Sequence, residues 1–322
     1  MKVLVLDDYI DIAQSSAPWD TLPAGTELRI LRKAISSLQA RIREFEPYDV
    51  IVAMRERTAF PALLIESLPN LRLLVTTGTR NASIDLESCR RRGIVVCAAP
   101  GSAPGSAPAE LTWALILGLM KRIPMLHRSL LEGRWQTEAT GQVAGKVLGL
   151  VGLGKLGAQV AKVGAAFGMR VQAWSPHLDA QRAAQAGASL VDKTTLFATS
   201  DVVSLHLVLG ATTTGIVQRA DLQAMKQTAI FINTARAELV EAGALEEALA
   251  EGRIGGAGLD VFRNEPLPAG EPLLGLDNVI LTPHVGYVTP ENMAAFYGNA
   301  LQAILAWHAG SPIRVLEGTE RR

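Results

Sequence analysis

The segment at residues 146–157, KVLGLVGLGKLG, constrains the possible folds of this chain more than any other. The apolar run at 147–151 is short and uncharged, which predicts a strand buried in a parallel sheet. Gly152, Gly154 and Gly157 then form a G-x-G-x-x-G turn, and a helical pattern follows at once. Strand, glycine turn and helix in this order are the context in which such a turn predicts dinucleotide binding.

Each glycine of this turn has a physical role in the prediction. Gly152 permits the tight turn, Gly154 lets the backbone approach a pyrophosphate, and Gly157 lets the helix pack closely on the strand. The phosphates then meet free N–H groups at the N-terminus of the helix. A purely structural turn is the alternative, because glycine-rich turns serve many strand–helix junctions.

Length and composition restrict the class of protein. The chain has 322 residues, which is enough for two domains. Hydrophobic residues make up 48% and charged residues 19%, which is typical of a folded enzyme and not of a disordered chain. Lys+Arg and Asp+Glu both number 31, so the net charge is zero and provides no general attraction to nucleic acid or an acidic membrane.

The same composition bears on location. Cys89 and Cys97 could form a disulfide, but we favour two buried free thiols in a reducing cytosol. The N-terminus, MKVLVLDDYI, becomes acidic too soon for a signal peptide. No window approaches the roughly 18 uncharged apolar residues of a membrane span. We therefore expect a cytoplasmic protein that needs neither a membrane nor nucleic acid as a partner, and we expect no metal site.

Apolar runs separated by helical patterns predict two successive α/β units. In the first unit the expected strands are 2–6, 27–31, 50–53, 71–75 and 94–97. In the second unit they are 147–151, 170–174, 202–207, 230–233, 258–261 and 279–281. Repeated strand–helix units indicate parallel sheets with helices on both faces.

Two stretches of small residues and prolines, 98–108 and 286–290, predict crossings between domains. Between the first crossing and the glycine turn, 109–131 reads as a long buried helix that Pro124 kinks or divides. A last helix is expected at 291–309. A disordered linker at 98–108 is the alternative.

The two crossings predict that one domain is inserted into the other. We expect a discontinuous substrate-binding domain at 1–100 and 288–322, and a dinucleotide-binding domain at 101–287. The predicted fold class is α/β, with two domains that each contain a doubly wound parallel sheet. A Rossmann cofactor domain is inserted into a flavodoxin-like substrate domain. A hinge with two crossings can close over a cleft, where we expect the active site.

Three polar residues follow predicted strands in the second half, namely Arg236, Glu265 and His284. Hydride transfer to a 2-oxo acid needs a cation for the carboxylate, a proton donor for the oxygen, and a partner for that donor. Arg236 can form two hydrogen bonds with a carboxylate. A glutamate beside His284 would favour the imidazolium form and fix the orientation of the ring, which suits a proton donor. Taken alone, Arg236 is open to interpretation as a surface ion pair and His284 as a structural residue.

Four motifs together resemble the D-isomer-specific 2-hydroxyacid dehydrogenase family. They are VGLGKLG at 151–157, INTARAELV at 232–240, GAGLDVFRNEPLP at 256–268 and LTPHVGY at 281–287. The resemblance extends over almost the whole chain. It implies an oxidoreductase that acts on the CH–OH group, reversibly reducing a small 2-oxo acid to a D-2-hydroxy acid with NAD or NADP.

The resemblance also implies roles for individual residues. Arg236, Glu265 and His284 correspond to the catalytic set, and Asp260 to the residue facing the nicotinamide carboxamide. Substrate contacts are expected from Gly78, Thr79, Arg80, Arg236 and His284. Cofactor contacts are expected from Gly152, Gly154, Lys155, Leu156, Gly157, Ser175, His206, Thr234, Ala235, Asp260, His284 and Gly286.

Several positions depart from the family pattern. Ser175 stands where members that prefer NAD usually carry an Asp, so the choice between NAD and NADP stays open, and His177 or Arg182 would have to hold a 2′-phosphate. Asp179 is expected to cap a helix. Val208 and Gly210 replace a Pro and a Thr in the loop after His206. We interpret His206 itself as a mainly structural residue. Ala237 replaces a Gly, and the substrate loop at 77–81 is less glycine-rich than usual.

Two alternatives remain. A formate dehydrogenase of the same fold typically has Gln where Glu265 stands, which argues against it. A non-catalytic protein that senses NAD(H) is disfavoured by the intact Arg236, Glu265 and His284. The resemblance further implies a homodimer built through the cofactor domain and the helix at 109–131. The sequence does not reveal which oxo acid is natural.

Overall fold

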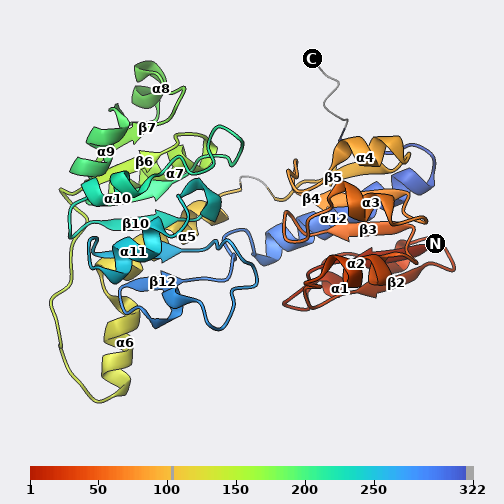
Figure 1. Cartoon of the computed structure of the whole chain (residues 1–322), viewed down its shortest axis with the longest axis horizontal. Coiled ribbons are helices and arrows are strands. Elements are labelled where there is room, and N and C mark those ends of the chain that lie inside the picture. The colour runs from red at the N-terminus through yellow and green to blue at the C-terminus, as the bar shows by residue number, and fades with distance from the viewer. Residues whose placement is uncertain (103–104, 317–322) are drawn as a thin grey trace. The chain divides into compact units, whose positions relative to one another are not determined.

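The computed structural model describes residues 1–102 and 105–316. Residues 103–104 of the first predicted crossing and residues 317–322 of the predicted substrate-binding domain lie outside the described residues. The chain divides into two compact units (Figure 1). Unit 1 comprises Met1–Gly105 and Val288–Arg322, and unit 2 comprises Ser106–Tyr287.

Unit 1 is built on a parallel five-stranded sheet. Its strands are β1 (Lys2–Val5), β2 (Glu27–Ile30), β3 (Val50–Ala53), β4 (Leu73–Thr77) and β5 (Val95–Ala99). The strand order is β2-β1-β3-β4-β5, and all pairs are parallel. This is the flavodoxin-like order, in which the chain reverses direction across the sheet between β1 and β3.

Helices flank this sheet because each strand is followed by a segment of helical periodicity. They are α1 (Ala13–Ser16), η1 (Trp19–Thr21), α2 (Leu38–Phe45), α3 (Ala62–Glu66), α4 (Leu86–Arg91) and α12 (Pro290–His308). The C-terminal helix α12 packs on β4, β5 and α1. Its fully buried Tyr297 contacts Trp19 edge-on, with ring centroids 6.2 Å apart. The last described helix therefore completes the unit that the first residues begin.

Unit 2 contains a parallel seven-stranded sheet. Its strands are β6 (Val147–Val151), β7 (Arg170–Trp174), β8 (Ser189–Leu190), β9 (Val202–Leu205), β10 (Ile230–Asn233), β11 (Gly256–Leu259) and β12 (Val279–Leu281). The order is β12-β11-β10-β9-β6-β7-β8. Counted from β6, this is the Rossmann order 3-2-1-4-5-6 with β12 added at the edge. The strand β8 has only two residues and was not predicted.

Helices cover both faces of this sheet as well. They are α5 (Ala107–Met120), α6 (Ile123–Leu131), α7 (Lys155–Ala166), α8 (Ala180–Gln185), α9 (Lys193–Thr199), α10 (Arg219–Ala224), η2 (Ala237–Leu239), α11 (Ala244–Ala250) and η3 (Pro272–Gly275). Helices α5 and α7 pack together, as do α9, α10 and α11. The prediction of two α/β units with parallel sheets is thus confirmed.

The predicted long helix at 109–131 is two helices. Helix α5 ends at Met120, and Arg122 adopts a left-handed conformation with φ 50° before α6 begins. Pro124 lies in the first turn of α6, where its missing N–H costs no helical hydrogen bond. The prediction that Pro124 divides the helix is therefore confirmed. Figure 1 shows α6 and the segment after it extending away from the sheet of unit 2.

Both cysteines are free and buried, as predicted. Burial raises the pKa of Cys89 to about 12 and that of Cys97 to about 11, so both thiols stay protonated. Among the described residues, no helix combines the length and apolar character that crossing a membrane requires.

Candidate active site

The glycine turn has the geometry that its sequence predicts. Gly152 has φ 102°, and a Cβ there would come within 2.7–2.9 Å of backbone atoms at 206–207. At Gly157 a Cβ would lie 2.4 Å from the carbonyl oxygen of Gly152. Neither position accepts a side chain, because the obstructing atoms are backbone.

Gly154 differs from the other two glycines. A Cβ there would meet no atom within 4 Å, so the space beside its backbone is open. Gly154 is the N-cap of α7, which has no side-chain cap at this end. Open space next to uncapped N–H groups is what a bound pyrophosphate requires, so the turn fits a dinucleotide.

The loop after β7 lies next to this turn, because the N–H of Gly152 donates to the carbonyl of Trp174 at 2.8 Å. A pocket of about 440 Å³ lies here, lined by Trp174, Ser175, Pro176, Leu178, Leu190, Val191 and Asp192. Asp179 is the N-cap of α8 and accepts a hydrogen bond from the N–H of Arg182 at 2.8 Å, as predicted. Position 175 itself is a serine, and among the described residues that line this pocket the one charged side chain is the carboxylate of Asp192.

His206 lies directly behind the glycine turn. Its Nε2 is 2.9 Å from Oγ of Ser204. Desolvation lowers the pKa of His206 to about 4, so the ring is neutral at physiological pH. The loop that follows is exposed at Val208 and is closed by Thr213, whose hydroxyl donates to the Val208 carbonyl.

Arg236 follows β10 and is positioned by the last residue of that strand. The side chain of Asn233 donates to the carbonyl of Arg236 at 2.9 Å and accepts from the N–H of Ala235 at 3.0 Å. The guanidinium of Arg236 donates to the carbonyl of Ala235 at 2.7 Å. The adjacent Thr234 hydroxyl lies 2.8 Å from that of Thr112 on α5. Asn233 and Thr112 were not predicted: Asn233 lies in the INTARAELV motif but was assigned no role there, and Thr112 belongs to no motif.

Glu265 and His284 are in direct contact. His284 Nδ1 lies 2.6 Å from Glu265 Oε2, although 18 residues separate them in the chain. The N–H of Phe262 donates to the other carboxylate oxygen of Glu265 at 2.9 Å. With Nδ1 occupied in this way, Nε2 is the ring nitrogen of His284 that remains to face a substrate.

The electrostatic environment keeps Glu265 ionised. Burial opposes ionisation, but the hydrogen bond and charge of His284, the N–H of Phe262 and the charge of Arg236 outweigh it. Together they hold the pKa of Glu265 below its usual value. The structure therefore brings the three predicted catalytic groups into one electrostatic cluster.

Asp260 fixes the segment that carries His284. One carboxylate oxygen accepts from the hydroxyl of Thr282 at 2.6 Å and the N–H of Val285 at 2.8 Å. The other accepts from the N–H of Gly286 at 2.8 Å. Burial is the dominant influence on Asp260 and raises its pKa. These contacts give Asp260 a positioning role that the family resemblance did not suggest.

The predicted substrate loop belongs to unit 1 and follows β4. Gly78 has φ 100°, and its N–H donates to the carbonyl of Ala99 at 2.6 Å. A Cβ at Gly78 would lie 2.0 Å from a guanidinium nitrogen of Arg55, a residue that was not predicted to belong to the site. Thr79 and Arg80 are exposed. A charged residue two positions after the buried strand β3 was the available signal for Arg55.

The family model for the D-isomer specific 2-hydroxyacid dehydrogenase NAD binding domain matches residues 113–286. The chain is 36% identical to D-3-phosphoglycerate dehydrogenase of Archaeoglobus fulgidus over 98% of its length, but spans only 58% of that protein. It is 34% identical to glyoxylate reductase of Aeropyrum pernix, covering 82% of this chain and 84% of that one.

A solved structure agrees with these matches. Phosphoglycerate oxidoreductase of Vibrio cholerae superimposes with a TM-score of 0.90 at 36% identity, covering 97% of this chain and 100% of that one. The chain belongs to the D-isomer-specific 2-hydroxyacid dehydrogenase family, which confirms the resemblance seen in its motifs. Unit 2 contains the NAD-binding domain of that family, in agreement with the predicted cofactor class.

Proposed function

We propose that this protein is an NAD(P)-dependent dehydrogenase that interconverts a small 2-oxo acid and the corresponding D-2-hydroxy acid. The observation that carries the proposal is the 2.6 Å contact between His284 and Glu265, beside Arg236, in a unit that contains the family's NAD-binding domain. We assign cofactor binding to unit 2 and substrate binding chiefly to unit 1.

The catalytic roles follow from the chemistry of each group. When bound, the reduced nicotinamide supplies the hydride that is added to the carbonyl carbon. His284 donates a proton from Nε2 to the carbonyl oxygen, so the carbonyl becomes a CH–OH group and the imidazole becomes neutral. Glu265 stabilises the protonated ring before transfer and fixes its orientation through Nδ1. In the oxidative direction the same nitrogen accepts the proton.

Arg236 binds the oxo acid through charge and directed hydrogen bonds. Asn233 fixes its backbone, and the charge of its guanidinium contributes, after that of His284, to the lowered pKa of Glu265. We propose that Gly78, Thr79 and Arg80 of unit 1 also bind the substrate. Thr79 and Arg80 are exposed directly after the left-handed Gly78, and backbone N–H groups in such a turn suit an anion.

We propose further that the enzyme accepts both NADH and NADPH. Ser175 cannot repel a 2′-phosphate, whereas the Asp usual at that position would. None of the described residues that line the pocket beside Ser175 is cationic, and Lys193, whose ammonium lies 5.8 Å from the centre of the Trp174 ring, pairs with Asp221 at 2.5 Å. Without an Asp at position 175 to repel the 2′-phosphate or a cation to bind it, discrimination between NADH and NADPH should be weak.

We propose a homodimer formed through unit 2. The side chains of Ile123, Leu130, Leu131 and Trp135 are 55–77% exposed on α6 and the segment after it. Apolar residues grouped in this way mark an interaction surface. A second copy of the chain is the occupant we favour, since a two-fold contact buries the same patch on both subunits. A cytoplasmic location remains our expectation, with two reduced thiols compatible with it.

The test of the activity is oxidation of NADH and NADPH with glyoxylate, hydroxypyruvate and pyruvate, followed by loss of absorbance. We expect turnover with at least one oxo acid. In His284→Ala turnover should fall by about 10²- to 10⁴-fold, because general acid catalysis is lost, while calorimetric binding of NADH is retained. NADH binding without oxidation of any of these acids would favour a sensing protein, and reduction of NAD by formate would favour a formate dehydrogenase.

A further inference from the structure

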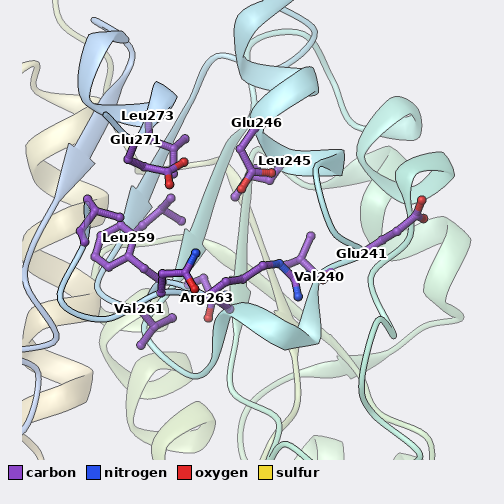
Figure 2. Close-up of a pocket in the computed structure, with 14 residues that line it drawn as sticks. Val240, Glu241, Leu245, Glu246, Leu259, Val261, Arg263, Glu271 and Leu273 are labelled. Carbon is purple, nitrogen blue, oxygen red and sulfur yellow. Dashed lines mark hydrogen bonds between the residues drawn. The ribbon is translucent and has the colours of Figure 1, made fainter. Parts of the chain in front are cut away.

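Unit 2 contains a second cavity that the proposed reaction does not use. It has a volume of about 120 Å³ and lies between the segment after β10, the start of α11 and the loop after β11 (Figure 2). Its walls include Val240, Leu245, Leu259, Val261 and Leu273, each less than 7% exposed. An apolar space with a few polar groups at its edge is the usual form of a small-molecule site.

This cavity is separate from the catalytic residues but touches their supports. Arg236, Glu265 and His284 do not line it, whereas Asn233 and Phe262 do. Asn233 donates to the carbonyl of Arg236 and the N–H of Phe262 donates to Glu265. Two residues that position the catalytic cluster therefore border the cavity.

The charges at the cavity are mainly negative. The described residues that line it include Glu241, Glu246 and Glu271, against a single cation, Arg263. The guanidinium of Arg263 is bound to the carbonyl of Val240. Figure 2 shows the carboxylates of Glu246 and Glu271 projecting toward the same space, while Arg263 runs along another side and Glu241 points away.

We propose that this cavity is an effector site for a small primary alkylammonium ion. The carbon chain would lie among the apolar walls, with the ammonium group between Glu246 and Glu271. An engineered apolar cavity of about 150 Å³ binds benzene, so the present volume suits a chain of about four carbons. Net negative charge beside an apolar interior selects a cation over an anion or a neutral alcohol.

An effect on catalysis follows by linkage, and this part rests on the proposed function. A ligand that binds the arrangement seen here stabilises that arrangement. Occupancy should therefore hold the backbone of Phe262 in the position from which its N–H binds Glu265. The ligand would then favour the state in which Glu265 orients His284.

The binding test uses the full-length chain without cofactor or oxo acid. Isothermal titration with n-butylammonium chloride should give saturable binding, and butan-1-ol should bind more weakly. In the double variant Glu246→Gln, Glu271→Gln, binding should weaken by about tenfold, as expected for two partly exposed ion pairs. Glu251→Gln is the control, because Glu251 caps the same helix, α11, and does not line the cavity.

Absence of binding to the wild-type chain, or equal binding by the double variant, would overturn the site. Its coupling to Glu265 is tested by hydrogen–deuterium exchange at 260–266, which should slow on addition of n-butylammonium in the wild type and not in the double variant. Unchanged exchange in the saturated protein would overturn the coupling. Neither measurement depends on turnover, so an inactive enzyme still tests the cavity, and an active enzyme that ignores the amine leaves the proposed reaction intact.

Discussion

His284 is held in a backbone conformation that it would not adopt on its own. Its φ of 52° lies in the left-handed region, which costs a residue other than glycine about 1–2 kcal/mol. The three hydrogen bonds to the buried carboxylate of Asp260, from residues on both sides of His284, offset this cost. The position of the proposed proton donor therefore depends on a residue 24 positions earlier in the chain.

The Glu265–His284 pair predicts a pH dependence of stability. The pKa of Glu265 is lowered in the folded state, so its ionised form stabilises the fold above its unfolded pKa of about 4.3. This contribution is lost as the pH falls through the lower, folded-state pKa. Glu265→Gln should therefore reduce the free energy of unfolding at pH 7 and reduce it less, or not at all, near pH 3.

Urea unfolding across that pH range measures this difference. The matched control is the same substitution in a His284→Gln background, where the partner that stabilises the carboxylate is gone. There the effect of Glu265→Gln should change much less with pH. An effect in the wild-type background that is constant from pH 7 to pH 3 would contradict the assigned pairing.

Ser175 predicts the response of cofactor choice to a single charge. Ser175→Asp should weaken NADPH binding by at least about tenfold through repulsion of the 2′-phosphate, and should retain or strengthen NADH binding through the ribose hydroxyls. Calorimetric dissociation constants for both cofactors give the ratio. Ser189→Asp on β8 is the control, since it adds the same charge near the pocket without lining it. An unchanged ratio in Ser175→Asp would remove this loop from the cofactor site.

At the scale of elements, the junction of β6 and α7 separates two kinds of glycine. Gly157 lacks room for a side chain because the Gly152 carbonyl is in the way, whereas Gly154 faces open space. Glycine is required at position 157 by packing within the protein. At position 154 it is required by the pyrophosphate that we propose to bind there.

These two glycines give a paired prediction. Gly157→Ala should reduce the free energy of unfolding by about 1–3 kcal/mol, because backbone must move to accept the methyl group. Gly154→Ala should leave thermal stability nearly unchanged while weakening NADH binding, since its methyl group enters the space proposed for the pyrophosphate. Thermal unfolding and calorimetry of both variants check this. If Gly154→Ala bound NADH normally, the pyrophosphate would have to lie elsewhere.

At the scale of the whole molecule, the feature that points to a second chain is the exposed apolar side chains of α6 and the segment after it, with Leu131 75% and Trp135 77% exposed. Residues 131–140 are all exposed, and this segment forms no helix or strand beyond Leu131. Such a segment gains its order most readily from a contact with another chain, which is the physical basis for proposing the dimer.

Leu131→Glu tests that contact. A charge placed in the apolar patch should convert a dimer to a monomer, because burying an unpaired carboxylate is costly. Leu63→Glu is the control: Leu63 is also an exposed leucine, 59% accessible against 75% for Leu131, and lies in unit 1. Size-exclusion chromatography with light scattering gives the mass of each variant. A monomeric wild-type protein, or dissociation in both variants, would contradict an interface at α6.

Sequence alone was sufficient wherever the determinant is local. The apolar runs predicted eleven of the strands because buried parallel strands are short and uninterrupted, and the glycine turn predicted its own backbone geometry. The helix cap at Asp179 and the break near Pro124 depend on a few neighbouring residues and were also predictable. The catalytic set was selected by residue type and family resemblance.

Tertiary structure decided everything that depends on residues distant in the chain. The pairing of Glu265 with His284, the hydrogen bonds from Asp260 to the His284 segment, and the approach of Arg55 to Gly78 arise where separate loops meet at the ends of parallel strands. The cavity beside α11 likewise lies between separate elements, so it depends on how they pack and could not be predicted from the residue pattern of any one of them. Periodicity reports which face of an element is buried, but only packing decides which atoms it is buried against.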